Sequence, residues 1–443
     1  MRGHRRFATI AAAALLATGL VAGCGDDDEG DSGAATSTAA QGDDSIRGDV
    51  SVVGVWTGDE QRSFQAVLDA FEERFPNVSV RYTAGGDNTP TVLSTAVEGG
   101  EPPDIAAVAQ PGLVKDFQRK DALQPIGFAR ETLDAQYPGD IVELGEIEEE
   151  LYSFVFKAAN KSTVWFNVAA FESAGVEPPE TWKQFLENAQ TLQASGTPAY
   201  SIGGADGWTL TDLFENIYLR QAGPEKYDQL TEHEIPWTDQ SVKDALEAMA
   251  QILGDTKNIR GGTTGALQTE FPASVENVFA DPARAAQVIE GDFVPGVVAE
   301  NNPLEPGTGY DVFPFPSIGD AQNVVVGGGD SIIMFKDSPA AQALVNFLTT
   351  KEAHEAWASR GGFSSPNTEV DDSVYPDDIT RKTATAIADA ETFRFDMSDL
   401  APVDFGGTPG QGQWKILQDF LEDPDDVDGA ASKLEASAKR AYE

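Results

Sequence analysis

Aromatic and hydrogen-bonding side chains stand beside glycines at the ends of predicted loops, where a ligand could reach them. Trp56, Trp208 and Phe363 adjoin Gly and polar residues instead of lying inside apolar runs. Side chains that accept hydroxyl protons occur in similar settings, namely Gln110, Asp206, Asp292 and Asp330. A sugar has apolar C–H faces ringed by hydroxyls, so it needs flat aromatic platforms and amide or carboxylate acceptors. These residue types predict a carbohydrate site, although each aromatic taken alone is more often a core residue.

Catalytic chemistry has few groups to draw on. His233 and His354 are the histidines beyond the N-terminal segment, each is isolated, and we expect both at the surface. The sequence has no G-x-S-x-G elbow and no phosphate-binding loop pattern. Among 73 acidic residues, carboxylate pairs of the glycosidase kind arise by chance. We therefore expect no enzyme activity, no catalytic residue and no cofactor.

One acidic segment partly matches a calcium-binding loop. Asp426, Asp428, Gly429 and Glu435 occupy its third, fifth, sixth and twelfth places, but Pro424 at the first place offers no side-chain oxygen. We interpret the segment as an acidic turn beside a helix and predict no metal site.

The N-terminus has the pattern of a secretory signal. Arginines within residues 2–6 precede an uncharged Ala/Leu-rich run over residues 7–21. The single cysteine, Cys24, follows at once, and residues 21–24 (Val-Ala-Gly-Cys) resemble the bacterial lipobox. We predict a signal peptide over residues 1–23 and lipidation of Cys24, with a chance cysteine after an ordinary signal as the alternative. Two or more acyl chains anchor a protein durably, because each buried CH₂ contributes about 0.8 kcal/mol.

Residues 24–48 are rich in Gly, Ser, Thr, Ala, Gln and Asp, so we expect a disordered acidic tether.

The chain carries a net charge of −43, which repels nucleic acid and anionic lipid and disfavours a polyanionic ligand. No later stretch reaches the roughly 18 consecutive apolar residues of a transmembrane helix. We therefore expect contact with the cell membrane through the lipid anchor only, with the protein facing outside the cytoplasm.

Strand and helix patterns alternate after the tether. Residues 50–55 form an apolar run fit for a buried strand, and from Glu60 apolar residues recur at helical spacings. Further strands are predicted at 78–82 and from 103, with helices at 91–97 and from 111. Repeated strand–helix units imply a mostly parallel sheet that binds ligands at the carboxyl ends of its strands. The loops to watch are therefore residues 56–59 and 109–112.

The rest of the chain continues with helices and one long strand. Helices are predicted at 182–194, 211–220, 241–253 (capped by Asp239) and 339–349, and a strand at 324–335. About 395 residues follow the tether, which is more than one hydrophobic core usually supports, so two lobes are expected.

Short segments occur in a distinctive order between residues 50 and 442. They are Val55-Trp56-Thr57-Gly58, Pro103-Asp104-Ile105, Thr163-Val164-Trp165-Phe166-Asn167, Pro179-Glu180-Thr181-Trp182, Glu290-Gly291-Asp292-Phe293, Gly327-Gly328-Gly329-Asp330-Ser331 and Gly362-Phe363-Ser364-Ser365-Pro366-Asn367. Together they resemble the family 1 extracellular solute-binding proteins of ABC importers, which include the maltose-binding protein. Segments 109–112, 207–212, 219–224 and 395–399 look closer to the α-glucoside-binding branch.

This resemblance implies an α/β fold of the two-lobed periplasmic-binding-protein type II, with a mostly parallel sheet flanked by helices in each lobe and hinge strands between them. The implied N-terminal lobe comprises residues 49–154 with 324–365, and the C-terminal lobe 155–323 with 366–443. The chain would cross near Ser153 and after Pro316. We expect a monomer that closes on its ligand and presents it to ABC permease subunits.

Family positions and the acceptors above together define the predicted ligand site. Phe293 stands where relatives place an aromatic stacker, and Trp414 follows a Gly-rich segment longer than theirs. The predicted residues are Trp56, Thr57, Asp59, Glu60, Gln110, Pro111, Asp206, Trp208, Asp212, Asp292, Phe293, Gly329, Asp330, Phe363 and Trp414.

The predicted ligand is a neutral carbohydrate, an α-glucoside or an oligosaccharide. Two alternatives stay open. A binding protein for a non-sugar such as a polyamine would suit the negative charge, and a lipid-anchored glycan-active hydrolase would share the exported, acidic character.

Overall fold

The computed structural model of the chain describes residues 45–301, 304–321 and 323–443. The predicted signal peptide, Cys24 and residues 24–44 of the predicted tether lie outside the described residues. The first strand begins at Gly48, so the last residue of the predicted tether is already part of the fold. Within the described ranges, no helix is both long enough and apolar enough to cross a membrane.

The strands form two main sheets. They are β1 (Gly48–Gly54), β2 (Val78–Ala84), β3 (Ile105–Val108), β4 (Glu146–Ile147), β5 (Glu150–Leu151), β6 (Ser153–Asn160), β7 (Thr163–Asn167), β8 (Gln287–Ile289), β9 (Tyr310–Pro314), β10 (Val324–Met334) and β11 (Thr392–Phe395). A six-stranded sheet has the order β11-β10-β3-β1-β2, with β6 also paired to β10, and a three-stranded sheet has the order β8-β7-β9. Strands β4 and β5 pair with each other.

Helices make up much of the remaining chain. They are α1 (Gly58–Arg74), α2 (Thr89–Glu98), α3 (Pro111–Arg119), α4 (Arg130–Gln136), α5 (Gly139–Glu143), α6 (Val168–Ala174), α7 (Trp182–Ala194), α8 (Trp208–Ala222), α9 (Pro224–Thr231), α10 (Gln240–Leu253), α11 (Gly262–Ala266), α12 (Phe271–Phe279), α13 (Val294–Asn301), α14 (Pro339–Leu348), α15 (Lys351–Ala358), α16 (Asp378–Thr385), α17 (Met397–Leu400), α18 (Val403–Gly406), α19 (Gly412–Glu422) and α20 (Val427–Tyr442).

The strands and helices predicted from periodicity are confirmed, with small shifts at their ends. Helix α8 begins at Trp208, three residues before the predicted start. Helix α10 is capped as predicted, because the carboxylate of Asp239 accepts a hydrogen bond from the backbone N–H of Ser241.

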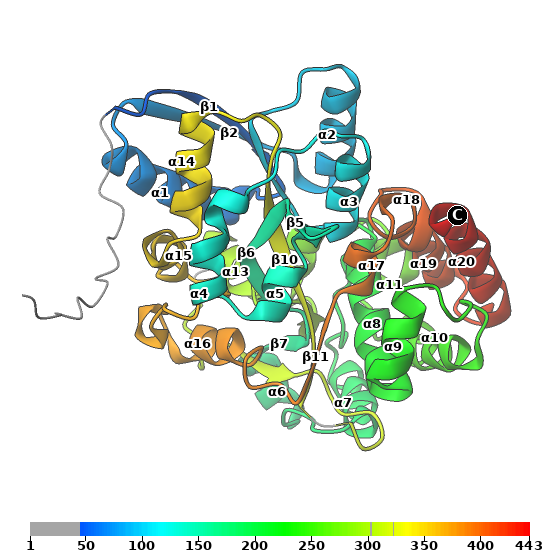
Figure 1. Cartoon of the computed structure of the whole chain (residues 1–443). Helices are drawn as coiled ribbons and strands as arrows, with labels where there is room; N and C mark the ends of the chain where they lie inside the picture. The colour runs from blue at the N-terminus through cyan, green and yellow to red at the C-terminus, as the bar shows by residue number, and fades with distance from the viewer. Residues whose placement is uncertain (1–44, 302–303, 322) are drawn as a thin grey trace, which may run out of the picture. The chain divides into compact units, whose positions relative to one another are not determined.

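The six-stranded sheet is buried on both faces. Its side chains alternate between the two faces, and helices cover each face. On β3, Ile105 and Ala107 join the core built with α1, α14 and α15. Ala106 and Val108 join the core built with α2 and α3. Figure 1 shows these two groups of helices on opposite sides of the strands. The alternation fixes the register of the sheet, since a one-residue slip would exchange the two faces.

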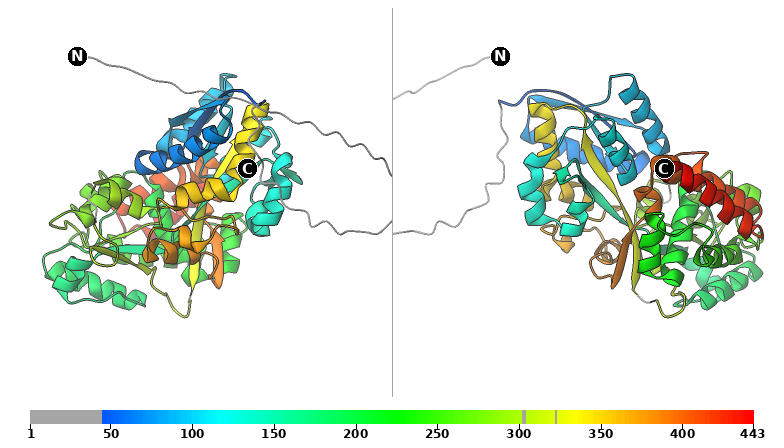
Figure 2. Two further views of the ribbon diagram at one scale, coloured as in Figure 1. Left: turned by 90° about the vertical axis from the view of Figure 1, so that its left-hand side faces the viewer. Right: turned by 45° about the vertical axis from the view of Figure 1, so that its right-hand side comes forward.

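A second core surrounds helix α8. Every residue of α8 from Thr209 to Arg220 is buried, as expected for a helix covered on all sides. Its apolar side chains pack with those of α10, α19 and α20. Figure 2 shows the C-terminal helices (red) beside the mid-chain helices (green), so segments about 200 residues apart in sequence share this core.

The directions of the strands differ in part from the mostly parallel arrangement that we predicted. β2, β1 and β3 run parallel, as do β10 and β11, but β10 is antiparallel to both β3 and β6. Both ladders of β7 are antiparallel. Parallel pairing follows from strand–helix–strand units, which connect β1 to β3. β10 enters from the other sheet, so no such unit sets its direction.

The chain passes between the two sheets at two connections near each other. Strand β6 stays in the six-stranded sheet as far as Asn160, and β7 begins the three-stranded sheet at Thr163. The chain returns between the end of β9 at Pro314 and the start of β10 at Val324. The predicted lobe boundary between residues 154 and 155 falls inside β6, and the lobe boundaries stay predictions.

The prediction of a surface role is wrong for His354. Its side chain is fully buried, with ring nitrogens 2.8 Å from the Tyr137 hydroxyl and 2.8 Å from the Ser365 hydroxyl. Burial lowers the pKa of His354 to about 3, so it is neutral. His233 is half-buried, 3.2 Å from a carboxylate oxygen of Glu435. The sequence shows His354 as an isolated histidine, and this did not reveal that it lies on the buried face of helix α15.

The acidic segment near the C-terminus begins a helix. Asp426 caps α20 by accepting a hydrogen bond from the backbone N–H of Gly429. Over the ranges that the structure describes, there is no cluster of three or more side chains that could hold a metal ion.

Close packing of α3 against the C-terminal part of the chain yields a stability prediction. A Cβ atom on Gly112 would lie 1.9 Å from the carbonyl oxygen of Ala401, so Gly112→Ala must push two backbones apart. We expect a loss of about 1–3 kcal/mol in the free energy of unfolding, measured by chemical denaturation. Gly127→Ala is the matched control, because its added Cβ meets no atom within 4 Å. Equal stability of the two variants would contradict the packing.

Candidate functional site

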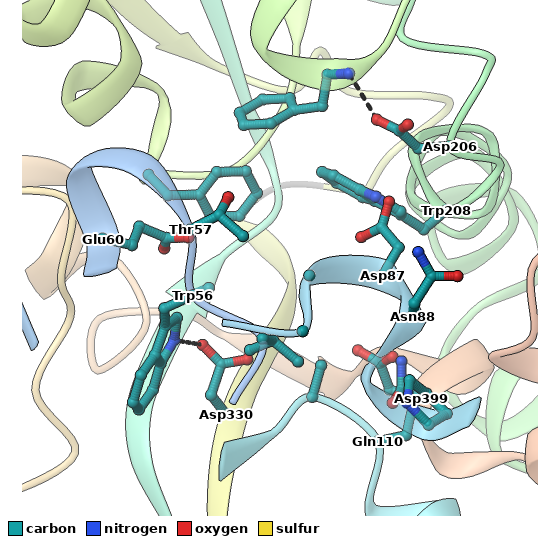
Figure 3. A pocket seen from close by; sticks show the side chains of 18 of the residues that line it. Trp56, Thr57, Glu60, Asp87, Asn88, Gln110, Asp206, Trp208, Asp330 and Asp399 are labelled. Atoms are coloured by element: carbon teal, nitrogen blue, oxygen red, sulfur yellow. Dashed lines mark hydrogen bonds between the residues drawn. The ribbon is translucent and has the colours of Figure 1, made fainter. Parts of the chain in front are cut away.

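A cavity of about 370 Å³ lies where loops of the six-stranded sheet face segments that include the first residues of α8 and α12 (Figure 3). The lining from the sheet side consists of Val55, Trp56, Thr57, Glu60, Gly85, Gly86, Asp87, Asn88, Pro90, Ala109, Gln110, Lys157, Ala159, Lys161, Gly329 and Asp330. The lining from the other side consists of Asp206, Trp208, Glu270, Phe271, Pro272, Phe293, Ser398, Asp399 and Trp414.

The parallel strands explain why these loops meet. The loops after β1, β2 and β3 supply Thr57, Asp87 and Gln110 respectively. Because the three strands are parallel neighbours, their carboxyl ends reach the same edge of the sheet. Thr57 and Gln110 are also N-cap residues of α1 and α3, so the cavity receives the N-terminal ends of two helices.

Lys157 on β6 organises the sheet side of the cavity. Its ammonium is almost fully buried, 2.8 Å from a carboxylate oxygen of Glu60 and 3.8 Å from one of Asp330. Asp330 in turn accepts a hydrogen bond of 2.6 Å from the indole N–H of Trp56, a contact visible in Figure 3. Burial raises the pKa of Glu60, although the positive charge of Lys157 acts to lower it. The Lys157 ammonium therefore holds the carboxylates of Glu60 and Asp330 in place.

Lys161 organises the opposite side in the same way. Its ammonium lies 2.5 Å from Asp396, 3.2 Å from Asp212 and 3.3 Å from Asp399. Although burial disfavours the ammonium, these carboxylates raise the pKa of Lys161 well above its ordinary value. Burial and the charge of Asp396 raise the pKa of Asp399 to about 8. Asp399 therefore offers the cavity a protonated carboxyl at neutral pH, which can donate a hydrogen bond.

Three aromatic rings form a wall of the cavity. The ring centroids of Trp208, Phe271 and Phe293 lie between 5.3 and 6.0 Å apart, in tilted or edge-on contacts. All three side chains are only partly buried, so their remaining faces are open to the cavity. Such surfaces bind flat apolar groups, including the C–H face of a sugar ring.

The backbone around Trp208 is fixed by two contacts. Gly207 has φ +88°, and a Cβ there would lie 2.6 Å from the Cβ of Trp414, so only glycine fits. Asp206 accepts a 2.6 Å hydrogen bond from the backbone N–H of Phe271, which ties the start of α8 to the start of α12. These contacts orient the aromatic wall before any ligand arrives.

Carboxylates near this wall repel one another. Desolvation by the surrounding protein raises the pKa of Asp87 to about 6, and the charges of Asp206 and Glu270 add to this increase. Asp87 nonetheless keeps contact with solvent. This group therefore changes charge between the acidic and the neutral range.

Two buried polar atoms on the cavity lining have no hydrogen-bond partner among the described residues. They are Oε1 of Gln110, an acceptor, and Nε1 of Trp414, a donor. Unpaired buried polar atoms are costly, by about 1–3 kcal/mol each. Both atoms are thus available to a ligand that carries hydroxyl groups.

The structure brings most of the predicted site residues to this cavity. The predicted residues that line it are Trp56, Thr57, Glu60, Gln110, Asp206, Trp208, Phe293, Gly329, Asp330 and Trp414. The predicted residues that lie outside the lining are Asp59, Pro111, Asp212, Asp292 and Phe363.

Three of the predicted residues outside the lining are buried, namely Asp212, Asp292 and Phe363. Asp59 instead pairs with the exposed Arg62. Asp212 is buried beside Lys161, and Asp292 accepts a hydrogen bond from the hydroxyl of Ser364. Phe363 is buried in the core with its ring centroid 5.3 Å from that of Trp357. Trp56 lines the cavity, yet its side chain is fully buried and packs 4.5 Å from the ring of Phe64. Neither Trp56 nor Phe363 offers the open platform that the sequence led us to expect.

Sequence reasoning missed several lining residues. Asp87 and Asn88 follow β2 just as the predicted loop follows β1, so the same edge argument would have found them. Lys157 and Lys161 also had a signal, since they are the charged residues in the otherwise uncharged run 153–167. Phe271 had none that we recognise, because its helix was not predicted.

Comparisons with known proteins agree on one family. The family model for bacterial extracellular solute-binding proteins matches residues 57–355. The osmoprotective compounds-binding protein GgtB of Synechocystis sp. is 34% identical over 386 residues, covering 85% of this chain and 90% of GgtB. The alpha-glucosides-binding periplasmic protein AglE of Rhizobium meliloti is 31% identical over 403 residues, covering 87% of this chain and 86% of AglE.

Solved structures show the same fold at lower identity. The bacterial solute receptor AcbH, described as exclusive for β-D-galactopyranose, matches with a TM-score of 0.78 at 19% identity, covering 90% of this chain and 100% of AcbH. The protein RafE in complex with raffinose matches with a TM-score of 0.73 at 17% identity, covering 89% of this chain and 100% of RafE. These matches confirm the predicted two-lobed α/β fold class.

The cluster around Lys161 yields a prediction for stability and its pH dependence. Lys161→Met leaves buried carboxylates without a cation, so we expect a loss of about 3–5 kcal/mol at about pH 8. Unpaired buried carboxyls bind protons more tightly than they do in the unfolded chain, so the loss should shrink at about pH 5. Lys161 itself stays charged over this range and adds no pH dependence. Urea denaturation at both pH values measures the effect.

The control for this experiment is an exposed lysine. Lys183→Met removes an ammonium that pairs with Glu187 on the surface of α7, where we expect a change below about 1 kcal/mol. A Lys161→Met effect as small as that of the control, or one that is equal at both pH values, would contradict the assigned cluster.

Proposed function

Because this chain belongs to the family of bacterial extracellular solute-binding proteins, we propose that it captures a neutral carbohydrate, an α-glucoside or an oligosaccharide, in the cavity described above. The observation that carries the proposal is the pairing of an open aromatic wall with pre-oriented hydrogen-bonding groups in one cavity. The similarity to AglE, which binds α-glucosides, supports an α-glucoside as the ligand, and the similarity to GgtB, which binds osmoprotective compounds, leaves a wider range of ligands open.

Each lining group has a proposed role. Trp208 and Phe293 stack against the apolar face of a sugar ring. Gln110 and Asp330 accept hydroxyl protons, and the indole N–H of Trp414 donates to a ring or hydroxyl oxygen. The other predicted residues on the lining would add polar contacts around these.

We propose that ligand binding favours a closed arrangement of the lobes, which ABC permease subunits then recognise. A ligand shifts such an equilibrium only by its difference in affinity for the two states. Groups from both sides of the cavity contact the ligand only when the sides are close, so a sugar that spans them stabilises closure. In this role the protein, acting as a monomer, makes and breaks no covalent bond.

We also propose that Cys24 is lipidated after removal of residues 1–23 and that this anchor holds the protein on the outer side of the cell membrane. The lipobox-like segment 21–24 supports this, together with its place after an uncharged run. Residues 25–47 would then act as the tether between the membrane and the fold.

A polyamine is the second candidate ligand. Six carboxylates line the described cavity, from Glu60, Asp87, Asp206, Glu270, Asp330 and Asp399. Lys157 and Lys161 neutralise part of this charge, and Asp399 is protonated at neutral pH, which favours the neutral ligand. Asp87, Asp206 and Glu270 are the group that an ammonium would contact.

The aromatic wall gives the first test of the sugar assignment. Trp208→Ala and Phe293→Ala should each weaken binding of the preferred saccharide by at least about tenfold, or about 1.4 kcal/mol, because stacking area is lost. Calorimetric titration with a panel of di- and oligosaccharides measures this without relying on tryptophan fluorescence. Trp182→Ala and Phe128→Ala are the matched controls, since neither residue lines the cavity.

The outcomes separate the two ligand classes. A sugar site should respond strongly to the aromatic variants and weakly to Glu270→Gln, whereas a polyamine site should respond strongly to Glu270→Gln and Asp87→Asn. If no saccharide binds the folded wild-type protein, or if the aromatic variants bind like their controls, the sugar assignment fails.

Lipidation of Cys24 gives a separate prediction. The wild-type protein grown with labelled palmitate should carry the label, and its detergent-extracted mass should correspond to a chain that begins at acylated Cys24. Cys24→Ser should lose the label while its folded part still binds the ligand. A wild-type protein without acyl label, or a mature chain that begins elsewhere, would refute the anchor and leave the binding assignment untouched.

A further inference from the structure

A second cavity, of about 600 Å³, lies at the connections between the two sheets. Its lining includes Asn160 and Thr163, which flank the passage from β6 to β7, and Val324 at the start of β10. The end of β9, helix α16, residues 178–180 and Arg220 also contribute to it. No residue of this lining belongs to the cavity proposed for the sugar.

A buried guanidinium stands in the wall of this second cavity. Arg220, in the last turn of α8, is 6% exposed. Its Nη1 donates to the backbone and side-chain oxygens of Asn216 at 3.1 and 2.9 Å, and its Nη2 donates to the backbone oxygen of Val324 at 2.6 Å. The group also lies 4.8 Å from the ring centroid of Phe315. All these partners are neutral.

The charge of Arg220 has no acidic partner in the part of the chain that the structure describes. The absence of an acidic partner is unusual in this chain, because it has 73 acidic residues and only 30 basic ones. The other buried cations, Lys157 and Lys161, each pair with two or more carboxylates. Burial without a counter-charge lowers the pKa of Arg220 to about 9. The Nε–H also lacks an acceptor among the described residues. A buried charge of this kind is costly until an anion meets it.

The surroundings define the chemistry of that anion. Val312, Phe313 and Phe315 form an apolar wall, extended by Pro178 and Pro179. Lys382 of α16 adds an exposed ammonium that forms no ion pair with any described residue. Glu180 is the one carboxylate on the described lining, and it forms no ion pair with Arg220. A ligand here would set a negative group on Arg220 and an apolar body against the rings and prolines.

We propose that this cavity binds a small organic anion, a carboxylate on a compact apolar body, through Arg220 and Lys382. Arg220 provides a bidentate donor that matches carboxylate geometry, and Lys382 adds charge at the rim. Because the cavity is walled by both connections between the sheets, such a ligand would contact the segments that any relative movement of the sheets must bend. The proposal does not depend on the identity of the sugar.

Benzoate is the probe, with benzamide as its uncharged analogue. Saturation-transfer NMR titrations of the full folded protein should show saturable benzoate binding and no comparable benzamide binding. Arg220→Gln should weaken benzoate binding by at least about tenfold, and Lys382→Gln by a few-fold. Arg119→Gln, which removes an exposed guanidinium on α3, should leave it unchanged.

The outcomes decide the proposal even if one variant fails to fold. Lys382 is exposed, so Lys382→Gln tests the charge dependence should Arg220→Gln be unstable. The anion site would be overturned if benzoate does not bind the folded wild-type protein, binds no better than benzamide, or binds both folded variants as tightly as it binds the wild type. Binding of inorganic phosphate without benzoate would overturn the apolar part of the assignment.

Discussion

Two buried lysines on one short stretch of chain are the constraint on which the binding cavity depends. An ammonium and several carboxylates can share a dry interior only when each is paired, because isolated charges there are very costly. Lys157 draws Glu60 of α1 and Asp330 of β10 together, and Lys161 draws Asp212 of α8 together with two carboxylates at α17. The stretch that carries both lysines also carries the chain from one sheet to the other.

This arrangement would allow an acidic protein to hold the neutral ligand that we propose. The cations and the raised pKa of Asp399 reduce the negative charge at the cavity, while the oxygens remain fixed and able to exchange hydrogen bonds. The aromatic wall is fixed in the same way, through Gly207 and the hydrogen bond from Phe271 to Asp206. Pre-oriented groups lose little entropy on binding, so weak individual contacts can add up to useful affinity.

The sequence predicted those features that follow from periodicity and from the ends of strands. Alternation and helical spacing located β1, α1 and α10, and the edge of a parallel sheet located Gln110 and Thr57. It could not separate a buried ring from an open one, which is why Trp56 and Phe363 were expected as platforms and are core residues. Nor could it pair charges far apart in the chain, such as Lys161 with Asp396, because 73 acids give too many possible partners.

Protein isolated from its own host, without added sugars, offers the most direct test of the proposed function: denaturation releases its bound small molecules, which mass spectrometry then identifies. We expect a neutral polyhydroxylated compound that yields glucose on treatment with an α-glucosidase and that is depleted from the Trp208→Ala variant. Release of an amine instead, or of the same compounds in equal amounts from wild type and variant, would contradict it.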